Sequence, residues 1–215
     1  MIKGIIFDLD GVLCDLVEVH RDAFNDALAQ VCDYKIQENE FWKYYNGLPT
    51  KTKLKMLINR GIIKPEDQNY IWSLKQNTTF ARIVDNLKID QEKIKLHETL
   101  IQGGYTLACV SNSILKTIIL ALKTTGQHDF MNLILGNESF GNKPKPHPYC
   151  YNLAMQHLKM NKENVLIVED SDKGIRAARA SGAHVWEVKN AEEVTLKNIT
   201  KVLNNLNKRG NNEFN

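Results

Sequence analysis

The sequence predicts an α/β protein whose core is a Rossmann-like parallel sheet, with a helical cap domain inserted after the first strand. The run Ile5-Ile6-Phe7 is apolar at every position, as in a strand buried on both faces. Beyond Gly103-Gly104, short apolar segments alternate with helical patterns, which is typical of a parallel sheet covered by helices. Only helical patterns occur between Leu16 and Leu87. The predicted core therefore comprises residues 1–15 and 88–215, and the predicted cap comprises residues 16–87.

The predicted cap consists of helices alone. Apolar side chains recur at helical spacing, and Pro49 or Thr50 is well placed to begin a new helix after a break. The aromatic residues Trp42, Tyr44 and Tyr45 are expected to belong to the core of the cap rather than to contact a substrate. The expected cap helices cover residues 16–31, 38–45, 50–59 and 64–87.

The predicted core alternates strands with helices after residue 88. Strands are expected at residues 105–110, 132–135, 165–168 and 183–188, in addition to the first strand. Helices are expected at residues 91–102, 114–124, 149–159 and 174–181. The polar tail, residues 207–215, is expected to be loose.

Composition restricts the class of protein. A chain of 215 residues with 43% hydrophobic and 25% charged residues is typical of a globular protein with a sizeable core. A net charge of +3, with acidic and basic residues interleaved, does not favour binding to nucleic acid. No run of about 18 apolar residues is present that could span a membrane.

Cysteine usage and the first residues favour a cytoplasmic protein. Cys14, Cys32, Cys109 and Cys150 have no paired spacing that suggests zinc or a disulfide framework, so reduced and buried thiols are expected. Met1 is followed almost at once by the first strand, without a cleavable targeting segment. The oligomeric state is left open, and a monomer or a weak homodimer is expected.

Polar residues follow three of the predicted strands. In parallel sheets, ligands bind in the crevice beyond the carboxyl ends of the strands, so these residues should meet there. Oxygen ligands suit Mg²⁺, and a lysine offsets the negative charge of carboxylates and phosphoryl oxygens. The pattern predicts a site for Mg²⁺ and a phosphate group. The residues concerned are Asp8, Asp10, Ser111, Asn112, Glu169 and Asp170, with Lys143 and Lys145 from a loop.

The first acidic pair can be interpreted in two ways. If strand geometry continued, Asp8 and Asp10 would leave the chain on the same face, and two anions held so close need a cation. Asp10 and Gly11 could equally form an ordinary turn at the end of a strand.

Four motifs in order, DxDGV, SNS, KPxP and EDSxxG, resemble the haloacid dehalogenase superfamily, in its subgroup with a helical cap after the first motif. The resemblance implies that Asp8 is the nucleophile that becomes an aspartyl-phosphate, and that Asp10 is the general acid and base. It implies Mg²⁺ as the cofactor, held by Asp8, Asp10 through its backbone carbonyl, and Asp170, with Glu169 in support. Ser111 would hold a phosphoryl oxygen.

Several assignments within the resemblance stay open. Both Lys143 and Lys145 fit the KPxP motif, and spacing favours Lys145, which precedes Asp170 by 25 residues rather than by 27. Asn112 and His20 are expected to contact the phosphate or the substrate, although Asn112 could instead cap a helix, and His20 could be a packing or solvated residue. The sequence does not indicate which of the cap lysines face the site: Lys51, Lys53, Lys55 or Lys75.

The expected activity is that of a Mg²⁺-dependent phosphatase. Its substrate would be a small phosphorylated metabolite, such as a sugar, polyol or amino-alcohol phosphate. An alternative is a phosphomutase similar to β-phosphoglucomutase, which would release little inorganic phosphate relative to isomerised sugar phosphate. A third interpretation is a catalytically silent binding protein, which the intact acidic and lysine motifs do not favour.

Overall fold

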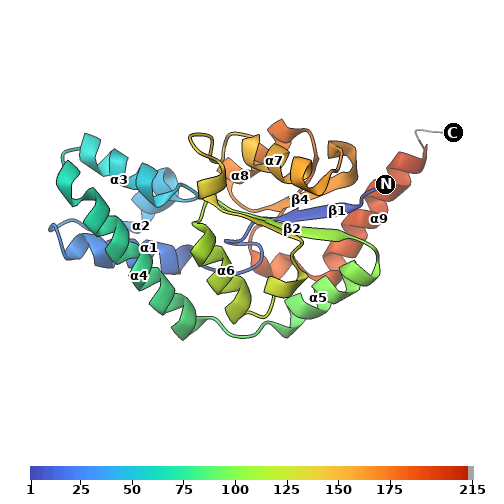
Figure 1. The fold of residues 1–215 in the computed structure, drawn as a ribbon, viewed down its shortest axis with the longest axis horizontal. Coiled ribbons are helices and arrows are strands. Elements are labelled where there is room, and N and C mark those ends of the chain that lie inside the picture. The colour runs from blue at the N-terminus through green and yellow to red at the C-terminus, as the bar shows by residue number, and fades with distance from the viewer. Residues whose placement is uncertain (213–215) are drawn as a thin grey trace.

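A five-stranded parallel sheet forms the centre of the protein (Figure 1). The structure, a computed structural model, describes residues 1–212, and the side chains of residues 1–208. The strand order is β3-β2-β1-β4-β5, so the first strand lies in the middle. The strands are β1 (Gly4–Phe7), β2 (Thr106–Val110), β3 (Leu133–Leu135), β4 (Val165–Glu169) and β5 (His184–Glu187).

The register of the sheet brings the ends of three strands together. Phe7, the last residue of β1, pairs with Cys109 of β2 and with Val168 of β4. Because the strands are parallel, the residues that follow these three positions emerge at the same edge of the sheet. The residues after β1, β2 and β4 are the polar motifs that sequence analysis placed together.

Helices cover both faces of the sheet, and side chains alternate between the two faces as strand geometry requires. Ile5 and Phe7 pack below the sheet against α5, α6 and α9, whereas Ile6 packs on the other face against α7 and α8. The predicted Rossmann-like core is confirmed. The covering helices are α5 (Gln91–Gln102), α6 (Leu115–Thr124), α7 (Tyr149–Leu158), α8 (Asp172–Ser181) and α9 (Leu196–Asn212).

The helices between β1 and α5 form the helical cap beside the core, at the left of Figure 1. The cap has a hydrophobic cluster of its own, which includes Phe24, Phe41 and Leu54, whereas Ile83 near the end of α4 packs in the main core. The exact boundary of the cap stays a prediction. Its elements are α1 (Val17–Ala29), α2 (Glu38–Glu40), a π-helical turn (Phe41–Tyr45), α3 (Thr50–Asn59) and α4 (Gln68–Asn86).

Two expectations about side chains and ends are wrong in part. Tyr45 is buried in the cap core as expected, but Trp42 and Tyr44 are each 49% exposed because they lie on the outer face of the π-helical turn. Residues 207–212, expected to be loose, continue α9, since Ile199 and Leu203 give that helix an apolar face on the core. Residues 213–215 lie outside the described residues. Within residues 1–212, the helices are too short or too polar to cross a bilayer.

Candidate active site

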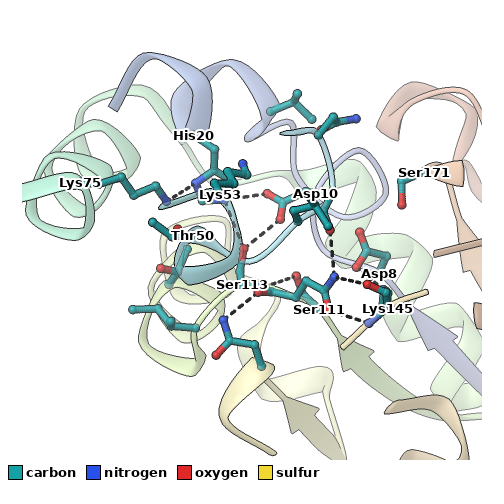
Figure 2. Close-up of a pocket in the computed structure, with 18 of the residues that line it drawn as sticks. Asp8, Asp10, His20, Thr50, Lys53, Lys75, Ser111, Ser113, Lys145 and Ser171 are labelled. Atoms are coloured by element: carbon teal, nitrogen blue, oxygen red, sulfur yellow. Dashed lines mark hydrogen bonds and ion pairs between the residues drawn. The ribbon is translucent and has the colours of Figure 1, made fainter. Parts of the chain in front are cut away.

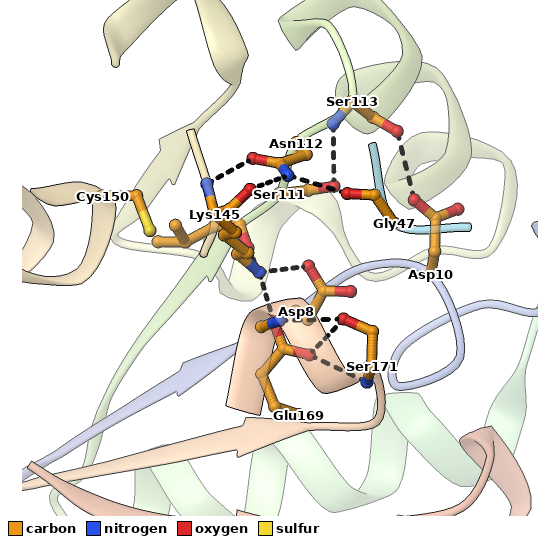
Figure 3. A network of polar contacts seen from close by, with 12 residues as sticks. Asp8, Asp10, Gly47, Ser111, Asn112, Ser113, Lys145, Cys150, Glu169 and Ser171 are labelled. Carbon is orange, nitrogen blue, oxygen red and sulfur yellow. Dashed lines mark hydrogen bonds and ion pairs between the residues drawn. The ribbon is translucent and has the colours of Figure 1, made fainter. Parts of the chain in front are cut away.

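The turn after β1 separates the two aspartates that follow the strand. β1 ends at Phe7, so Asp8 and Asp10 do not share a strand face, and Gly11 continues the turn with a φ of +78°. Figure 3 shows the result: the carboxylate of Asp8 faces Lys145, whereas that of Asp10 faces Ser113. The two carboxylates therefore have different partners.

Lys145 lies between two acidic side chains. Its Nζ atom donates hydrogen bonds to Oδ1 of Asp8 at 2.7 Å, to Oε1 of Glu169 at 2.5 Å and to the carbonyl of Val110 at 2.9 Å. Burial would lower the pKa of Lys145, but the negative charges of Asp8 and Glu169 outweigh burial and raise it. Lys143, the alternative that the motif allowed, is exposed and lies away from these acids, over a tyrosine ring.

Glu169 is completely buried and fixes its neighbours. Its Oε1 atom accepts hydrogen bonds from Lys145 Nζ at 2.5 Å and from the hydroxyl of Tyr151 at 2.6 Å. Its Oε2 atom accepts from the backbone N–H groups of Asp170 and Ser171 at 3.1 and 3.2 Å, and from the Ser171 hydroxyl at 3.2 Å. These five donors together fill the hydrogen-bond acceptor sites of the two Glu169 carboxylate oxygens. This arrangement favours a supporting role for Glu169 over direct binding of a cation.

The space that Glu169 occupies depends on a glycine in α8. A Cβ atom on Gly174 would lie 1.9 Å from Oε1 of Glu169. Helix propensity alone predicts that Gly174→Ala stabilises the protein by about 1 kcal/mol. We expect the reverse, a loss of about 1–3 kcal/mol, because the added methyl group displaces a carboxylate that has five hydrogen-bond donors. Urea denaturation measures the sign, and a gain in stability contradicts this account.

The carboxylates of Asp8, Glu169 and Asp170 form a buried acidic cluster. One oxygen of each lies within 4.8 Å of one oxygen of the other two. Burial raises the pKa of Asp8 well above its ordinary range, and Lys145 offsets only part of that effect. Burial, followed by the charges of Glu169 and Asp10, raises the pKa of Asp170 to about 7. The cluster therefore holds more negative charge than its one lysine neutralises.

A hard divalent cation such as Mg²⁺ fits this acidic cluster. Oδ1 of Asp170 is buried and accepts no hydrogen bond from residues 1–208, a costly state for a carboxylate oxygen unless a cation takes it. Gly11 leaves room for the same side chain, because a Cβ atom there would lie 2.1 Å from Oδ2 of Asp170. Oxygen ligands alone suit Mg²⁺. Among the three acids, the placement favours Asp8 and Asp170 as its carboxylate ligands.

Asp10 is held by a second set of contacts. Its Oδ2 atom accepts a hydrogen bond from the Ser113 hydroxyl at 3.1 Å, and its Oδ1 atom lies 3.2 Å from Nε2 of His20. The ammonium of Lys75 lies 3.1 Å from Nδ1 of His20, and an ammonium only donates, so Nδ1 accepts and Nε2 carries the proton toward Asp10. Burial raises the pKa of Asp10, but His20, Ser113 and Lys75 outweigh it and lower that pKa. Asp10 is therefore a carboxylate at neutral pH.

The residues after β2 lie beside Lys145. Ser111 is buried, and its Oγ atom accepts a hydrogen bond from the backbone N–H of Ser113 at 3.1 Å. Asn112 donates to the carbonyls of Gly47 and Lys145 at 2.9 and 3.2 Å, and its Oδ1 atom accepts from the Lys145 N–H at 3.1 Å. Ser111 lines the pocket together with Asp8 and Lys145. The contacts of Asn112 favour a positioning role instead, because its amide already holds both the lysine loop and the cap.

One pocket joins the core residues to the cap (Figure 2). The structure brings together all the predicted site residues in or beside it, apart from Glu169, which lies behind Lys145. Sequence reasoning missed Ser113, although it belongs to the SNS motif, and the cap residues Thr50 and Gln76, which carry no motif. The polar residues that line the pocket are Asp8, Asp10, His20, Asn46, Thr50, Lys53, Lys75, Gln76, Ser111, Asn112, Ser113, Thr117, Asn137, Lys145, Asp170 and Ser171.

The fold and the site together define a capped α/β enzyme with an acidic site at the carboxyl edge of its sheet. The family of haloacid dehalogenase-like hydrolases matches residues 5–188. The chain therefore belongs to that family, and the resemblance inferred from the four sequence motifs is confirmed.

Individual relatives have different names. The chain is 30% identical over 191 residues to a phosphoglycolate phosphatase of Vibrio vulnificus, covering 84% of this chain and 81% of the relative. It is 24% identical over 200 residues to the pyrophosphatase PpaX of Bacillus pumilus, covering 89% and 87%. The structure of a β-phosphoglucomutase from Clostridium difficile superposes with a TM-score of 0.81 at 21% identity, covering 95% of this chain and 98% of that one. The last comparison shows the fold alone.

Proposed function

We propose that this protein is a Mg²⁺-dependent phosphatase that hydrolyses a small phosphorylated metabolite through an aspartyl-phosphate on Asp8. The observation that carries the proposal is the position of the Asp8 carboxylate. It lies in a pocket under the cap, 2.7 Å from the Lys145 ammonium and within 4.8 Å of an oxygen of Asp170. Relatives named phosphoglycolate phosphatase and pyrophosphatase support the same class of reaction.

Each step of the reaction can be assigned to side chains of this chain. A carboxylate oxygen of Asp8 attacks phosphorus, the bond from phosphorus to the substrate oxygen breaks, and that oxygen takes a proton from the acid form of Asp10 as the acyl phosphate forms. Water then attacks that phosphorus, Asp10 accepts the proton of the water, and inorganic phosphate leaves as Asp8 is restored. The lowered pKa of Asp10 keeps this residue in the basic form that the second step needs. Ser111 and Lys145 hold the phosphoryl group in place between the two steps.

Charge neutralisation is the main demand of this chemistry, since phosphoryl transfer depends chiefly on positioning and electrostatic stabilisation. When bound, Mg²⁺ would supply positive charge beside the phosphoryl oxygens, and the residues that would hold it are Asp8 and Asp170, with the backbone carbonyl of Asp10. Lys145 supplies the second positive charge. Glu169 orients Lys145 and, through backbone hydrogen bonds, Asp170.

The cap closes the site against bulk water. Asn112 donates to the carbonyl of Gly47, and Lys173 of α8 donates to the carbonyl of Asn46 at 2.6 Å, so two core side chains hold one cap loop over the pocket. Exclusion of water strengthens the electrostatic interactions inside and limits the leaving group to what fits beneath the cap.

A screen of phosphate release over a panel of phosphorylated metabolites, with and without Mg²⁺, tests the proposed function. We expect Mg²⁺-dependent release of inorganic phosphate in excess over any isomerised sugar phosphate. Isomerised product in excess would indicate a phosphomutase. Absence of turnover throughout the panel and with p-nitrophenyl phosphate would indicate a silent binding protein and contradict the proposal.

Binding of Mg²⁺ is expected to raise the Tm more at about pH 8 than at about pH 5.5. The pKa of Asp170 is raised from 3.8 to about 7, so between these values the folded state binds more protons than the unfolded state. Without metal, stability therefore falls as the pH rises from about 4 to about 7. The cation competes with the same protons, so its stabilising effect is largest once the carboxyls are ionised.

Differential scanning calorimetry in MgCl₂ and in EDTA measures this effect without any substrate. Asp170→Asn should weaken the effect of Mg²⁺, and Asp15→Asn, which changes an exposed carboxylate outside the pocket, should not. A shift of equal size at both pH values, or none at either, contradicts the cation site.

We also propose a cytoplasmic location. Cys14, Cys32, Cys109 and Cys150 form no disulfide in the described part of the chain, which suits a reducing compartment. The oligomeric state, a monomer or a weak homodimer, stays a prediction.

A further inference from the structure

Two lysines of the cap project into the pocket. Lys53 comes from α3 and Lys75 from α4, and they are 5% and 4% exposed. Figure 2 shows them on the cap side of Asp10, away from Asp8 and Lys145 on the core side. The pocket therefore has positive groups at two places, one beside the acidic cluster and one beneath the cap helices.

Neither cap lysine has an acidic partner. In the part of the chain whose side chains are described, no carboxylate oxygen lies within 4.0 Å of either Nζ atom. The Nζ atom of Lys53 instead lies 4.9 Å from the centre of the Phe41 ring and 5.9 Å from that of Phe24, and that of Lys75 contacts the neutral His20. A buried ammonium without an anion is costly, so such groups are normally paired.

Other buried lysines of the same chain show what a structural role looks like. Lys93 donates to the backbone carbonyls of Ala191 and Val194 at 2.6 and 2.8 Å. Lys145 has three acceptors, two of them carboxylates. By contrast, Nζ of Lys53 donates no hydrogen bond to any residue from 1 to 208. Lys53 thus lacks the internal acceptors that hold the structural lysines.

The protein environment penalises the charge on both cap lysines. Burial, reinforced by the charge of Lys75, lowers the pKa of Lys53 to about 7. Burial also lowers the pKa of Lys75 to about 8, although Asp10 opposes this effect. An anion bound between the cap helices would remove this penalty, because opposite charge favours the ammonium form of each lysine.

We propose that Lys53 and Lys75 form a subsite for a second anionic group of the substrate, a carboxylate or a phosphate that is not transferred. This inference rests on the proposed function and names its substrate class: phosphate monoesters whose leaving group is itself an anion. The transferred phosphoryl group lies at Asp8 and Lys145, and the leaving group extends past Asp10 to the cap lysines. Thr50, one turn before Lys53, and Gln76, next to Lys75, supply neutral hydrogen-bonding groups there.

Matched substrates that differ only in the second anion test the subsite. Phosphoglycolate carries a carboxylate, ethylene glycol bisphosphate carries a phosphate, and ethyl phosphate carries neither. We expect kcat/KM for one of the two anionic substrates to exceed that for ethyl phosphate at least about tenfold, equivalent to about 1.4 kcal/mol. The preferred substrate identifies the second group as carboxylate or phosphate. Equal values for all three overturn the subsite.

The variant Lys53→Met keeps the length of the side chain and removes its charge. It should lower the ratio of kcat/KM between the preferred anionic substrate and ethyl phosphate by about tenfold, because one of two cations is lost. Lys55→Met, on the same helix but exposed and outside the pocket, should leave the ratio unchanged. Equal losses on all substrates in Lys53→Met would indicate a structural lysine and overturn the proposal.

The thermal stability of Lys53→Met provides a second test of the subsite. Removal of a buried, unpaired charge should raise the Tm of Lys53→Met by about 2–4 °C, whereas loss of a structural lysine lowers it. A lower Tm combined with equal losses on all substrates counts against the subsite.

Calorimetric titration separates this inference from the proposed function. In an Asp8→Asn protein, which cannot turn over, the preferred anionic substrate should bind at least about tenfold more tightly than ethyl phosphate, and Lys53→Met should abolish the difference. If the parent protein releases no phosphate but this preference holds, the phosphatase proposal fails and the subsite stands. If phosphate is released and the preference is missing, the subsite fails alone.

Discussion

Asp8→Asn is expected to reduce phosphate release by about three to six orders of magnitude, the range seen when a catalytic nucleophile is removed. The amide that replaces the carboxylate cannot attack phosphorus and form an acyl phosphate. The fold should survive, because asparagine has the same shape as aspartate, and Lys145 keeps Glu169 and the carbonyl of Val110 as acceptors. Steady-state kinetics with saturating Mg²⁺ measure the loss.

The matched control for this change is Asp15→Asn. Asp15 lies close in sequence to Asp8, but it is exposed and outside the pocket, so its amide variant should keep full activity. An Asp8→Asn protein with a tenth or more of the parent activity would show that another group, or water itself, attacks the phosphorus.

Lys145→Met is expected to have the largest effect on stability, a loss of about 3–5 kcal/mol, together with loss of phosphate release. Methionine fills a similar volume, so the loss comes from charge: the buried carboxylates of Asp8 and Glu169 would lose their shared cation. The pKa of Lys145 is raised in the folded protein, so its stabilising contribution is complete below the ordinary lysine pKa of about 10.4. Urea denaturation near neutral pH therefore records the whole effect.

Lys143→Met serves as the control for the lysine prediction. Lys143 lies two residues away in the same motif, but it is exposed, and its ammonium lies over the ring of Tyr149. Its replacement should change the free energy of unfolding by less than about 0.5 kcal/mol. Similar losses for the two variants would mean that the loop, rather than the charge of Lys145, matters for stability.

Much of the site could be predicted because parallel sheets bring distant residues to one edge. Asp8, Lys145 and Asp170 are far apart in the chain, yet each follows or approaches the carboxyl end of a central strand. The direction of the Asp10 side chain could not be predicted in the same way. Its direction depends on the turn at Gly11 and on Ser113 of a different loop, which strand periodicity does not encode.

The cap residues that line the pocket could not be predicted from the sequence for a different reason. Lys51, Lys53 and Lys55 alternate along α3, and at about 100° per residue Lys51 and Lys55 share one face of the helix whereas Lys53 lies on the opposite face. Which of the three faces the pocket depends on how α3 packs against the rest of the cap, and only Lys53 does so. The extension of α9 to Asn212 was missed because polar residues dominate its composition, although Ile199 and Leu203 keep a helical spacing.

Asn112 connects the cap to the loop that carries Lys145. The same side-chain amide that donates to Gly47 of the cap also holds the backbone N–H of Lys145 through its Oδ1 atom. If the cap moved away from the core, Asn112 would lose its contact with Gly47 and keep those with Lys145, so the lysine loop would be tied to the core alone. The loop that carries Lys145 is thus held most firmly while the cap lies over the pocket.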